Sequence, residues 1–411
     1  MNSAFSALAR RTKEPPISWL MKLTLERPKL ISLAAGFTDN ESLPVAATRE
    51  LAGKLLASAH TGRPALQYGA TVGDLELRRL TAKRLGEMDR RSYEPEQILI
   101  THGSQQLLYL VSECLCDAGD IVLVEDPTYF VFLGTAQSLG FHCCGIRMEQ
   151  DGLNIEHLEQ RLAALKKSGE IKRVKFLYLV TYFQNPSGIT TSFEKKAAAL
   201  DLLEKYERAA GHPIYVLEDA AYRELRFSGE DVPSAANPDR VIYAGTYSKP
   251  FATGIRVGFG ILPEPLRTVV SRLKGSHDFG TANLLQQIVS AAIASCRYKE
   301  HLTGLRKRYA QKAEVMANAI AEHFPKSVEW EKPRGGLYIW AKAPANTATG
   351  PKSKFFEAAL KRNVIYVPGE LCYADDPSRR KPNHEMRLSF GGATESDVRE
   401  GIKRLGALLS I

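Results

Sequence analysis

The sequence predicts an α/β protein with a large, doubly wound, mainly parallel sheet domain and a smaller α+β domain. From about Gln97 onward, short apolar runs alternate with amphipathic helical patterns, which is typical of strand–helix–strand units. The apolar runs are nearly continuous in Val, Ile and Leu, as expected of parallel strands buried on both faces. A length of 411 residues also suggests more than one domain.

The elements of the large domain follow in order from this alternation. The expected strands are Ile98–Thr101, Ile121–Val124, Phe141–Ile146, Val174–Val180, Ile214–Leu217, Val241–Ala244 and Val257–Ile261. Helices are expected over Gln105–Cys116, from near Thr128, over Ile155–Lys166 and over the alanine-rich Phe193–Ala210. This order predicts a sheet covered by helices on both faces.

The last third of the chain has a different pattern. Helices are expected over Thr281–Ser295 and Arg297–His323, followed by an extended segment, Val328–Ala341, that Gly335-Gly336 interrupts. The remaining expected elements are a helix at Lys354–Arg362, strands at Val364–Val367 and Met386–Phe390, and a helix from Glu395. We therefore expect an N-terminal arm that forms part of the small domain (1–50), a large domain (51–290) and a small C-terminal domain (291–411).

The composition argues against several classes of protein. Hydrophobic residues make up 44% and charged residues 25%, which is ordinary for a soluble globular protein. No apolar run is long enough to cross a bilayer, and the first 20 residues lack the apolar core of a secretory signal. We therefore expect a cytoplasmic protein that has no membrane partner.

The charged and metal-binding residue types give no partner of their own. The formal net charge is +9, but acidic residues interrupt or flank most of the basic clusters, so no nucleic-acid partner is expected. The six cysteines form no C-x-x-C pair, and the nine histidines show no metal-ligand spacing. We therefore expect free thiols and no metal site.

Common catalytic motifs are missing from the sequence. There is no G-x-x-x-x-G-K-[ST], G-x-G-x-x-G, H-E-x-x-H or G-x-S-x-G, which argues against the usual forms of phosphate transfer, dinucleotide redox chemistry and zinc or serine hydrolysis. Ligands of parallel sheets bind outside the carboxyl ends of the strands. Unusual residues at the expected strand ends are therefore the best candidates for a site.

Two strand ends offer groups that suit a phosphate. Gly103-Ser104-Gln105 opens a helix, whose free N–H groups attract anions, although the same residues could form a simple helix cap. Ser248-Lys249 is followed by Arg256, and hydroxyls with a guanidinium suit a dianion. A nearby cation and partial burial would lower the pKa of Lys249 and make it a Schiff-base nucleophile, although an exposed loop lysine is the simpler alternative.

Other strand ends offer groups that suit a ring and a carboxylate. Asp219 ends a strand and could hold a protonated ring nitrogen, with Tyr222 just beyond it. Tyr129 offers an aromatic surface for stacking, and Asn185-Pro186-Ser187-Gly188 follows a buried strand, where it could also be a plain turn. Arg387 lies among apolar residues and needs an anionic partner. Each of these strand-end features has an ordinary structural explanation when it is taken alone. Their occurrence together in one chain is better explained by a ligand-binding site.

Four motifs occur in a fixed order: Asn185-Pro186-Ser187-Gly188, Asp219-x-x-Tyr222, Ser248-Lys249 with Arg256, and Arg387. Together they resemble the motifs of the fold type I, pyridoxal-phosphate-dependent aminotransferases of class I/II. The resemblance extends from about Leu33 to the C-terminus and implies an aspartate-aminotransferase-like fold. Within this family, the chain is most similar to the group of 2-aminoadipate and kynurenine aminotransferases. The segments that carry this similarity are Thr101–Gln106, Leu66–Tyr68 with Gly73, and Arg387–Phe390. Ser187 stands where threonine is commoner, and Pro250 directly follows the lysine.

The resemblance implies roles in holding and using the cofactor, pyridoxal 5′-phosphate. Lys249 would hold it covalently and move the substrate proton, and Asp219 would keep its ring nitrogen protonated. Asn185 and Tyr222 would hydrogen-bond the ring oxygen, and Tyr129 would stack on the ring. The phosphate would be held by Gly103, Ser104, Gln105, Ser248 and Arg256, joined by Tyr68 from the second subunit of a homodimer.

The resemblance also implies the substrates. Arg387 would bind the α-carboxylate, with Asn185 and Gly36 beside it. The amino donor would be 2-aminoadipate or an aromatic or large aliphatic amino acid, and the acceptor a 2-oxo acid such as 2-oxoglutarate, in a ping-pong cycle. A β-lyase or a decarboxylase on the same fold is the alternative. A regulatory ligand-binding module is a remote one, because only about 30 residues precede the matched region, too few for a winged helix.

Overall fold

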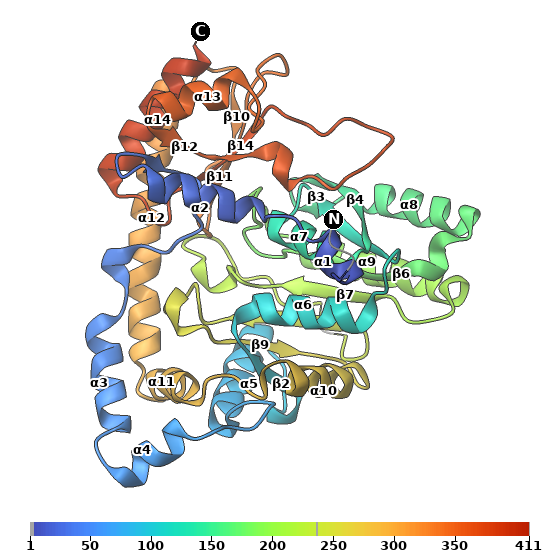
Figure 1. The fold of residues 1–411 in the computed structure, drawn as a ribbon, viewed down its shortest axis with the longest axis vertical. Helices are drawn as coiled ribbons and strands as arrows, with labels where there is room; N and C mark the ends of the chain where they lie inside the picture. Colours follow the sequence, from blue (N-terminus) through green and yellow to red (C-terminus); the bar gives the residue numbers. More distant parts are fainter. Residues whose placement is uncertain (1–3, 236, 411) are drawn as a thin grey trace.

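The computed structural model describes residues 4–235 and 237–410, and its centre is one eight-stranded sheet (Figure 1). The strands lie in the order β2-β9-β8-β7-β6-β3-β4-β5. Their bounds are β2 (Ile98–Thr101), β3 (Ile121–Asp126), β4 (His142–Glu149), β5 (Gly152–Leu153), β6 (Val174–Leu179), β7 (Tyr215–Asp219), β8 (Val241–Thr246) and β9 (Gly258–Ile261). The five strands β4, β3, β6, β7 and β8 run parallel to their neighbours in this series, while β9 is antiparallel to both β8 and β2. The predicted fold class is confirmed.

Alternate side chains of the central strands pack into separate cores on the two faces of the sheet. Leu123, Leu177 and Val216 belong to one buried cluster, whereas Val122 and Phe176 belong to the other. Because side chains alternate along a strand, burial of both faces requires apolar residues at every position. This explains the continuous apolar runs in the sequence.

Helices cover both faces of the sheet and lead into it. They are α5 (Leu75–Asp89), α6 (Gly103–Leu115), α7 (Phe130–Leu139), α8 (Ile155–Ser168), α9 (Phe193–Ala210) and α10 (Leu266–Asp278). Helix α8 packs against α9, and α6 packs against β8, β9 and α10. The N-terminal ends of α6 and α7 both lie just after a strand, so backbone N–H groups gather at the edge where parallel strands end.

The small lobe is built around a four-stranded antiparallel sheet in the order β10-β11-β14-β13. These strands are β10 (Glu329–Trp330), β11 (Tyr338–Lys342), β13 (Val367–Pro368) and β14 (Glu385–Ser389). Helices α12 (Arg297–His323), α13 (Lys354–Lys361) and α14 (Glu395–Leu409) complete it, and α12 packs along α14. In Figure 1, α12 runs from this lobe down to α11 (Asn283–Ala294).

The N-terminal segment contacts both lobes. Strand β1 (Ile31–Ser32) pairs in parallel with β12 (Val364–Ile365) of the small lobe, while α3 (Val45–Leu55) packs against α11. The remaining helices are α1 (Ala7–Arg11), α2 (Pro16–Glu26) and α4 (Ala59–Leu66). The domain boundaries at residues 50 and 290 stay a prediction.

Short 3-10 helices connect several of these elements. They are η1 (Asn40–Ser42), η2 (Pro95–Gln97), η3 (Glu170–Arg173), η4 (Arg223–Leu225), η5 (Thr253–Ile255) and η6 (Gly369–Cys372).

Within residues 4–235 and 237–410, none of the helices has the length and apolar character that crossing a bilayer requires.

Candidate active site

A cavity of about 460 Å³ lies where the central parallel strands end. Twelve of the residues expected at the site line it: Gly36, Gly103, Ser104, Gln105, Tyr129, Asn185, Asp219, Tyr222, Ser248, Lys249, Arg256 and Arg387. They come from the loops after β2, β3, β6, β7 and β8, from the segment after β1, and from β14 of the small lobe. Both lobes therefore contribute to the walls of the cavity.

One end of the cavity is built to hold an anion. Helix α6 begins at Gly103, and its first N–H groups lie beside Ser104 and the guanidinium of Arg256. Arg256 donates from Nη1 to the Ser248 hydroxyl at 3.3 Å and from Nη2 to the His102 carbonyl at 3.3 Å. A helix N-terminus, two hydroxyls and a guanidinium together match the charge and hydrogen-bonding needs of a phosphate dianion.

A Cβ on Gly103 would disturb this end of the cavity. Gly103 has φ +72°, and an added Cβ would lie 2.8 Å from Nη2 of Arg256. Glycine is the residue that adopts this backbone conformation without strain and that lets the arginine approach the helix start. The sequence motif Gly103-Ser104 thus has a steric reason as well as an electrostatic one.

Lys249 reaches the cavity from the loop after β8. Its Nζ donates a 2.8 Å hydrogen bond to the carbonyl oxygen of Gly36. Burial, with the charges of Arg387 and Arg256, lowers the pKa of Lys249 to about 8, and the charge of Asp219 opposes this shift. An amine with such a pKa is partly unprotonated near neutral pH and can attack a carbonyl group.

Asp219 lies at the end of β7 with its carboxylate held from two sides. Tyr178 donates from its hydroxyl to Oδ2 at 3.0 Å, and the backbone N–H of Ala221 donates to Oδ1 at 3.2 Å. Burial raises the pKa of Asp219 to about 6, against these hydrogen bonds and the charge of Lys249. A buried carboxylate of this kind gains stability by pairing with a cation such as a protonated ring nitrogen.

Two residues of the cavity hold Tyr222. Its hydroxyl lies 3.0 Å from the hydroxyl of Tyr338, and Nδ2 of Asn185 approaches the same oxygen at 3.5 Å. Burial, with Tyr338 and Tyr129 nearby, raises the pKa of Tyr222 well above its ordinary value. Tyr222 therefore keeps its proton and can donate it in a hydrogen bond.

Arg387 lies across the cavity from the sheet, on β14, with a side chain that is 1% exposed. Its Nη1 donates to Oδ1 of Asn185 at 2.7 Å, and its Nη2 donates to the carbonyl oxygen of Ala34 at 2.6 Å. Its Nε is buried and has no hydrogen-bond partner. A buried cation with a spare donor at a cavity indicates an anionic ligand such as a carboxylate.

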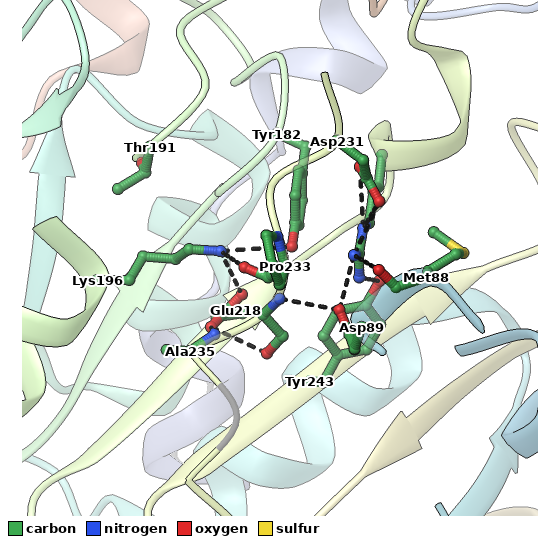
Figure 2. A network of polar contacts seen from close by, with 12 residues as sticks. Met88, Asp89, Tyr182, Thr191, Lys196, Glu218, Asp231, Pro233, Ala235 and Tyr243 are labelled. Atoms are coloured by element: carbon green, nitrogen blue, oxygen red, sulfur yellow. Dashed lines mark hydrogen bonds and ion pairs between the residues drawn. The ribbon is translucent and has the colours of Figure 1, made fainter. Parts of the chain in front are cut away.

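A buried polar network (Figure 2) supports the end of β7 and the loop that follows it, where Asp219 and Tyr222 lie. Glu218 precedes Asp219 on β7, accepts from the Ser234 hydroxyl at 3.1 Å, and lies 3.6 Å from Nζ of Lys196. Arg223 follows Tyr222 and donates to Asp89 at 2.7 Å. Each of these two adjacent pairs thus places one side chain in the cavity and the other in the network.

Several residues of the cavity were not expected from the sequence. Tyr338 and Phe37 line it, as do Ile17 and Met21 of α2, and Tyr178 supports Asp219 from below. For Tyr178, the sequence offered one signal, which is a polar hydroxyl within an otherwise apolar strand. Such a hydroxyl needs a hydrogen-bond partner. The others depend on contacts between segments far apart in the chain.

Tyr68 does not line the cavity of its own chain. It follows α4, is 80% exposed, and its ring packs edge-on against Phe279 with centroids 5.1 Å apart. Its expected contribution from a second subunit stays a prediction.

The residues present fit pyridoxal phosphate. The anion end would suit its phosphate, Asp219 its ring nitrogen, Tyr222 its ring oxygen and Lys249 its aldehyde, and this leaves the guanidinium of Arg387 for a further anion. Fold and site together define a fold type I pyridoxal-phosphate-dependent enzyme. The chain belongs to the aminotransferase class I and II family, whose model matches residues 28–405. It is a pyridoxal-phosphate-dependent aminotransferase.

Known aminotransferases are similar to this chain over nearly its whole length. The aromatic-amino-acid aminotransferase 1 of Thermococcus litoralis is 35% identical, over 98% of this chain and 93% of that protein. The 2-aminoadipate transaminase of Thermus thermophilus is 32% identical, over 99% and 97%. A kynurenine aminotransferase structure from Pyrococcus horikoshii, in complex with PMP, KYN and KYA, has a TM-score of 0.89 and 32% identity, covering 99% of this chain and 97% of that one.

Proposed function

We propose that the enzyme moves an α-amino group between a large amino acid and a 2-oxo acid in two half-reactions. The donors are 2-aminoadipate or aromatic or large aliphatic amino acids, and the acceptor is 2-oxoglutarate. The observation that carries this proposal is the buried guanidinium of Arg387, with its unpaired Nε, in the same cavity as Lys249. One holds an amino acid by its carboxylate while the other can act at its α-carbon.

Different residues of the cavity have different roles in the proposed reaction. Pyridoxal phosphate supplies an electron-accepting ring that stores the amino group between the half-reactions. Arg387 and Asn185 bind and orient the substrate carboxylate. Lys249 takes a proton from the α-carbon and returns it, because its lowered pKa places the free amine within reach at neutral pH. Asp219, fixed by Tyr178, holds the proton on the ring nitrogen.

The wall of the cavity favours an apolar substrate side chain. Ile17 and Met21 lie one turn apart on α2, and Phe37 lines the same cavity. The cations that line the described cavity are Lys249, Arg256 and Arg387, and each has a task already. We therefore expect aromatic and large aliphatic donors to fit this wall.

Half-reactions with single amino acids test this function. The protein with bound pyridoxal phosphate is mixed with one amino acid at a time, and the change of cofactor absorbance to that of the amine form is followed. Aromatic and large aliphatic amino acids should convert it, and 2-oxoglutarate should restore the starting spectrum. Release of pyruvate and ammonia, with no conversion to the amine form, would instead indicate the β-lyase.

We also propose a homodimer in which Tyr68 completes the partner's phosphate site. The exposed Tyr68 lies with two other exposed apolar side chains, Leu66 (69% exposed) and Phe279 (61% exposed), at one edge of the chain. Such a group is typical of a surface that is covered in an assembly. A cytoplasmic location is part of the same proposal, since all six cysteines are free.

Mixed dimers separate a role of Tyr68 within its own chain from a role across the interface. Tyr68→Ala and Lys249→Ala chains are each expected to be inactive or weak alone. If Tyr68 acts across the interface, a mixed dimer contains one intact site, and co-expression restores activity. If it acts within its own chain, or if the protein is a monomer, both sites of any mixture are damaged and no activity returns.

A further inference from the structure

We propose that Tyr338 is a further residue of this active site, which strengthens Tyr222 as a hydrogen-bond donor through its hydroxyl and positions Arg387 through its ring. Tyr338 opens β11 of the small lobe, is 2% exposed, and lines the cavity. The inference rests on the function proposed above, because it assigns Tyr222 to the cofactor and Arg387 to the substrate.

The hydroxyl of Tyr338 leaves the proton of Tyr222 free for the cavity. The two phenol oxygens lie 3.0 Å apart, and Nδ2 of Asn185 approaches the Tyr222 oxygen at 3.5 Å. When Tyr338 donates, the oxygen of Tyr222 accepts on both lone pairs and its one proton faces the ligand. A hydroxyl that accepts a hydrogen bond becomes a stronger donor, because chains of hydrogen bonds polarise one another.

The ring of Tyr338 lies against the guanidinium that binds the substrate. Its centroid is 4.2 Å from Cζ of Arg387, which is within cation–π distance. The edges of the same guanidinium are held by Asn185 and by the carbonyl of Ala34. The ring thus covers one face of Arg387, while hydrogen bonds fix the plane of the group.

The position of the Tyr338 hydroxyl is restricted by Gly36. A Cβ on Gly36 would lie 2.7 Å from the Tyr338 oxygen, so a larger residue would displace it. The carbonyl of Gly36 also accepts from Nζ of Lys249. One short backbone segment therefore separates the phenol from the catalytic amine.

The two parts of Tyr338 can be removed separately. Tyr338→Phe removes the hydroxyl and keeps the ring, whereas Tyr338→Leu removes both. The readout for the hydroxyl is the pH midpoint of the absorbance change of the lysine-bound cofactor. The charged and titratable groups that face this centre, and that stay unchanged in both variants, are Lys249, Arg256, Arg387, Asp219, Tyr129 and Tyr222.

The sign of the expected shift follows from which form Tyr222 stabilises. A hydrogen bond to the ring oxygen favours the form of the cofactor–lysine linkage that has lost its proton. A weaker donor therefore raises the midpoint, and we expect Tyr338→Phe to raise it by about half a pH unit, the size of a modest hydrogen-bond change. Tyr338→Leu should in addition raise KM for the amino donor about three- to tenfold, since Arg387 loses its cation–π contact.

Tyr366→Phe is the matched control. Tyr366 is a buried tyrosine of the same lobe, and its hydroxyl donates to the carbonyl of Thr349 at 2.7 Å, away from the cavity. The control should leave the midpoint and KM unchanged. An unshifted midpoint in Tyr338→Phe, or an equal shift in Tyr366→Phe, would overturn the inference. If the wild-type protein showed no absorbance of bound cofactor, the proposed function itself would fail instead.

Discussion

Nη1 of Arg387 donates a 2.7 Å hydrogen bond to Oδ1 of Asn185, which joins β14 of the small lobe to the loop after β6 of the large sheet. The same guanidinium donates to the carbonyl of Ala34 in the N-terminal segment, and its Nε remains without a partner. Three parts of the chain thus fix one cation in a buried position. In the proposed function, a substrate carboxylate would meet a charge that is already oriented.

Replacing this arginine should weaken substrate binding more than cofactor binding. A lysine cannot bridge Asn185, Ala34 and a carboxylate with one ammonium group. We expect Arg387→Lys to raise KM for the amino donor roughly 10- to 100-fold, the loss of a charge-assisted hydrogen bond or two, while the bound cofactor keeps its absorbance. Steady-state kinetics measure this. Arg240→Lys, which alters an ion pair with Glu207 far from the cavity, is the control, and equal KM values for both variants would contradict the role of Arg387.

The glycine at the start of α6 should control affinity for the phosphate. Gly103→Ala places a Cβ 2.8 Å from Nη2 of Arg256, so the arginine must move away from the anion end. We expect the dissociation constant for pyridoxal phosphate to rise about tenfold, the loss of roughly one charge-assisted contact. Equilibrium titration of the cofactor-free protein gives this constant.

Gly169→Ala separates this contact from backbone strain. Gly169 also has a positive φ, +81°, but a Cβ there meets nothing within 4 Å. Both substitutions should cost about 1 kcal/mol of stability, because alanine disfavours this conformation. If both variants lose cofactor affinity equally, the steric contact with Arg256 is not the cause.

Lys249 should destabilise the cofactor-free protein in a pH-dependent way. Burial lowers its pKa to about 8, from the ordinary lysine value of 10.5. Below pH 8 the amine is charged in the folded and the unfolded chain, and the folded state carries the full cost of the buried charge. As the pH rises from 8 toward 10.5, the folded chain loses its proton first and this cost disappears. Lys249→Met should therefore stabilise the cofactor-free protein by about 2 kcal/mol at pH 7, a value reduced because the amine faces a cavity.

Urea denaturation of the cofactor-free wild type and of Lys249→Met at pH 7 and pH 10 measures this difference. The gain from the substitution should shrink as the pH rises. A gain that grows with pH, or none at pH 7, would show that the amine is not held in a low-pKa environment.

The network beneath β7 should contribute strongly to stability. Lys196 and Glu218 are both fully buried, 3.6 Å apart (Figure 2), so removal of one leaves the other charged and unpaired. We expect Lys196→Met to lower the free energy of unfolding by about 3–5 kcal/mol, and the double variant with Glu218→Gln to recover part of it. Lys54→Met, at an exposed ion pair with Glu50, should change it by less than about 1 kcal/mol. Equal effects of Lys196→Met and Lys54→Met in thermal or urea denaturation would contradict this.

Strands and strand-end residues could be predicted from the sequence because their signals are local. A strand buried on both faces needs apolar residues throughout, so β3 and β6 are visible as runs of Val, Ile and Leu. Polar residues within a few positions of the ends of such runs mark the edge of the sheet where ligands bind, and this pattern indicated Asp219 and Asn185. The two-residue strand β1 has no such signal, because it exists through its pairing with β12, whose apolar residues were expected as part of a strand.

Residues that reach the cavity from other segments could not be predicted in the same way. Tyr338 lies 116 positions from Tyr222, and its hydroxyl contact depends on how the small lobe sits against the sheet. Ile17 and Met21 line the cavity from α2, and the sequence can indicate that a helix begins at Pro16 but not which surface the helix packs against. Residues that enter the site through packing between the two lobes could therefore be identified only from the structure.

The most direct test of the account is to locate the cofactor on the chain. Pyridoxal phosphate is bound to the protein, the linkage is reduced with borohydride, and the digested peptides are examined by mass spectrometry. We expect the cofactor on the peptide that contains Lys249, and no labelled peptide from Lys249→Ala treated in the same way. Label on a different lysine, or an equal amount of label in Lys249→Ala, would contradict the central claim that this cavity and this amine form the aminotransferase site.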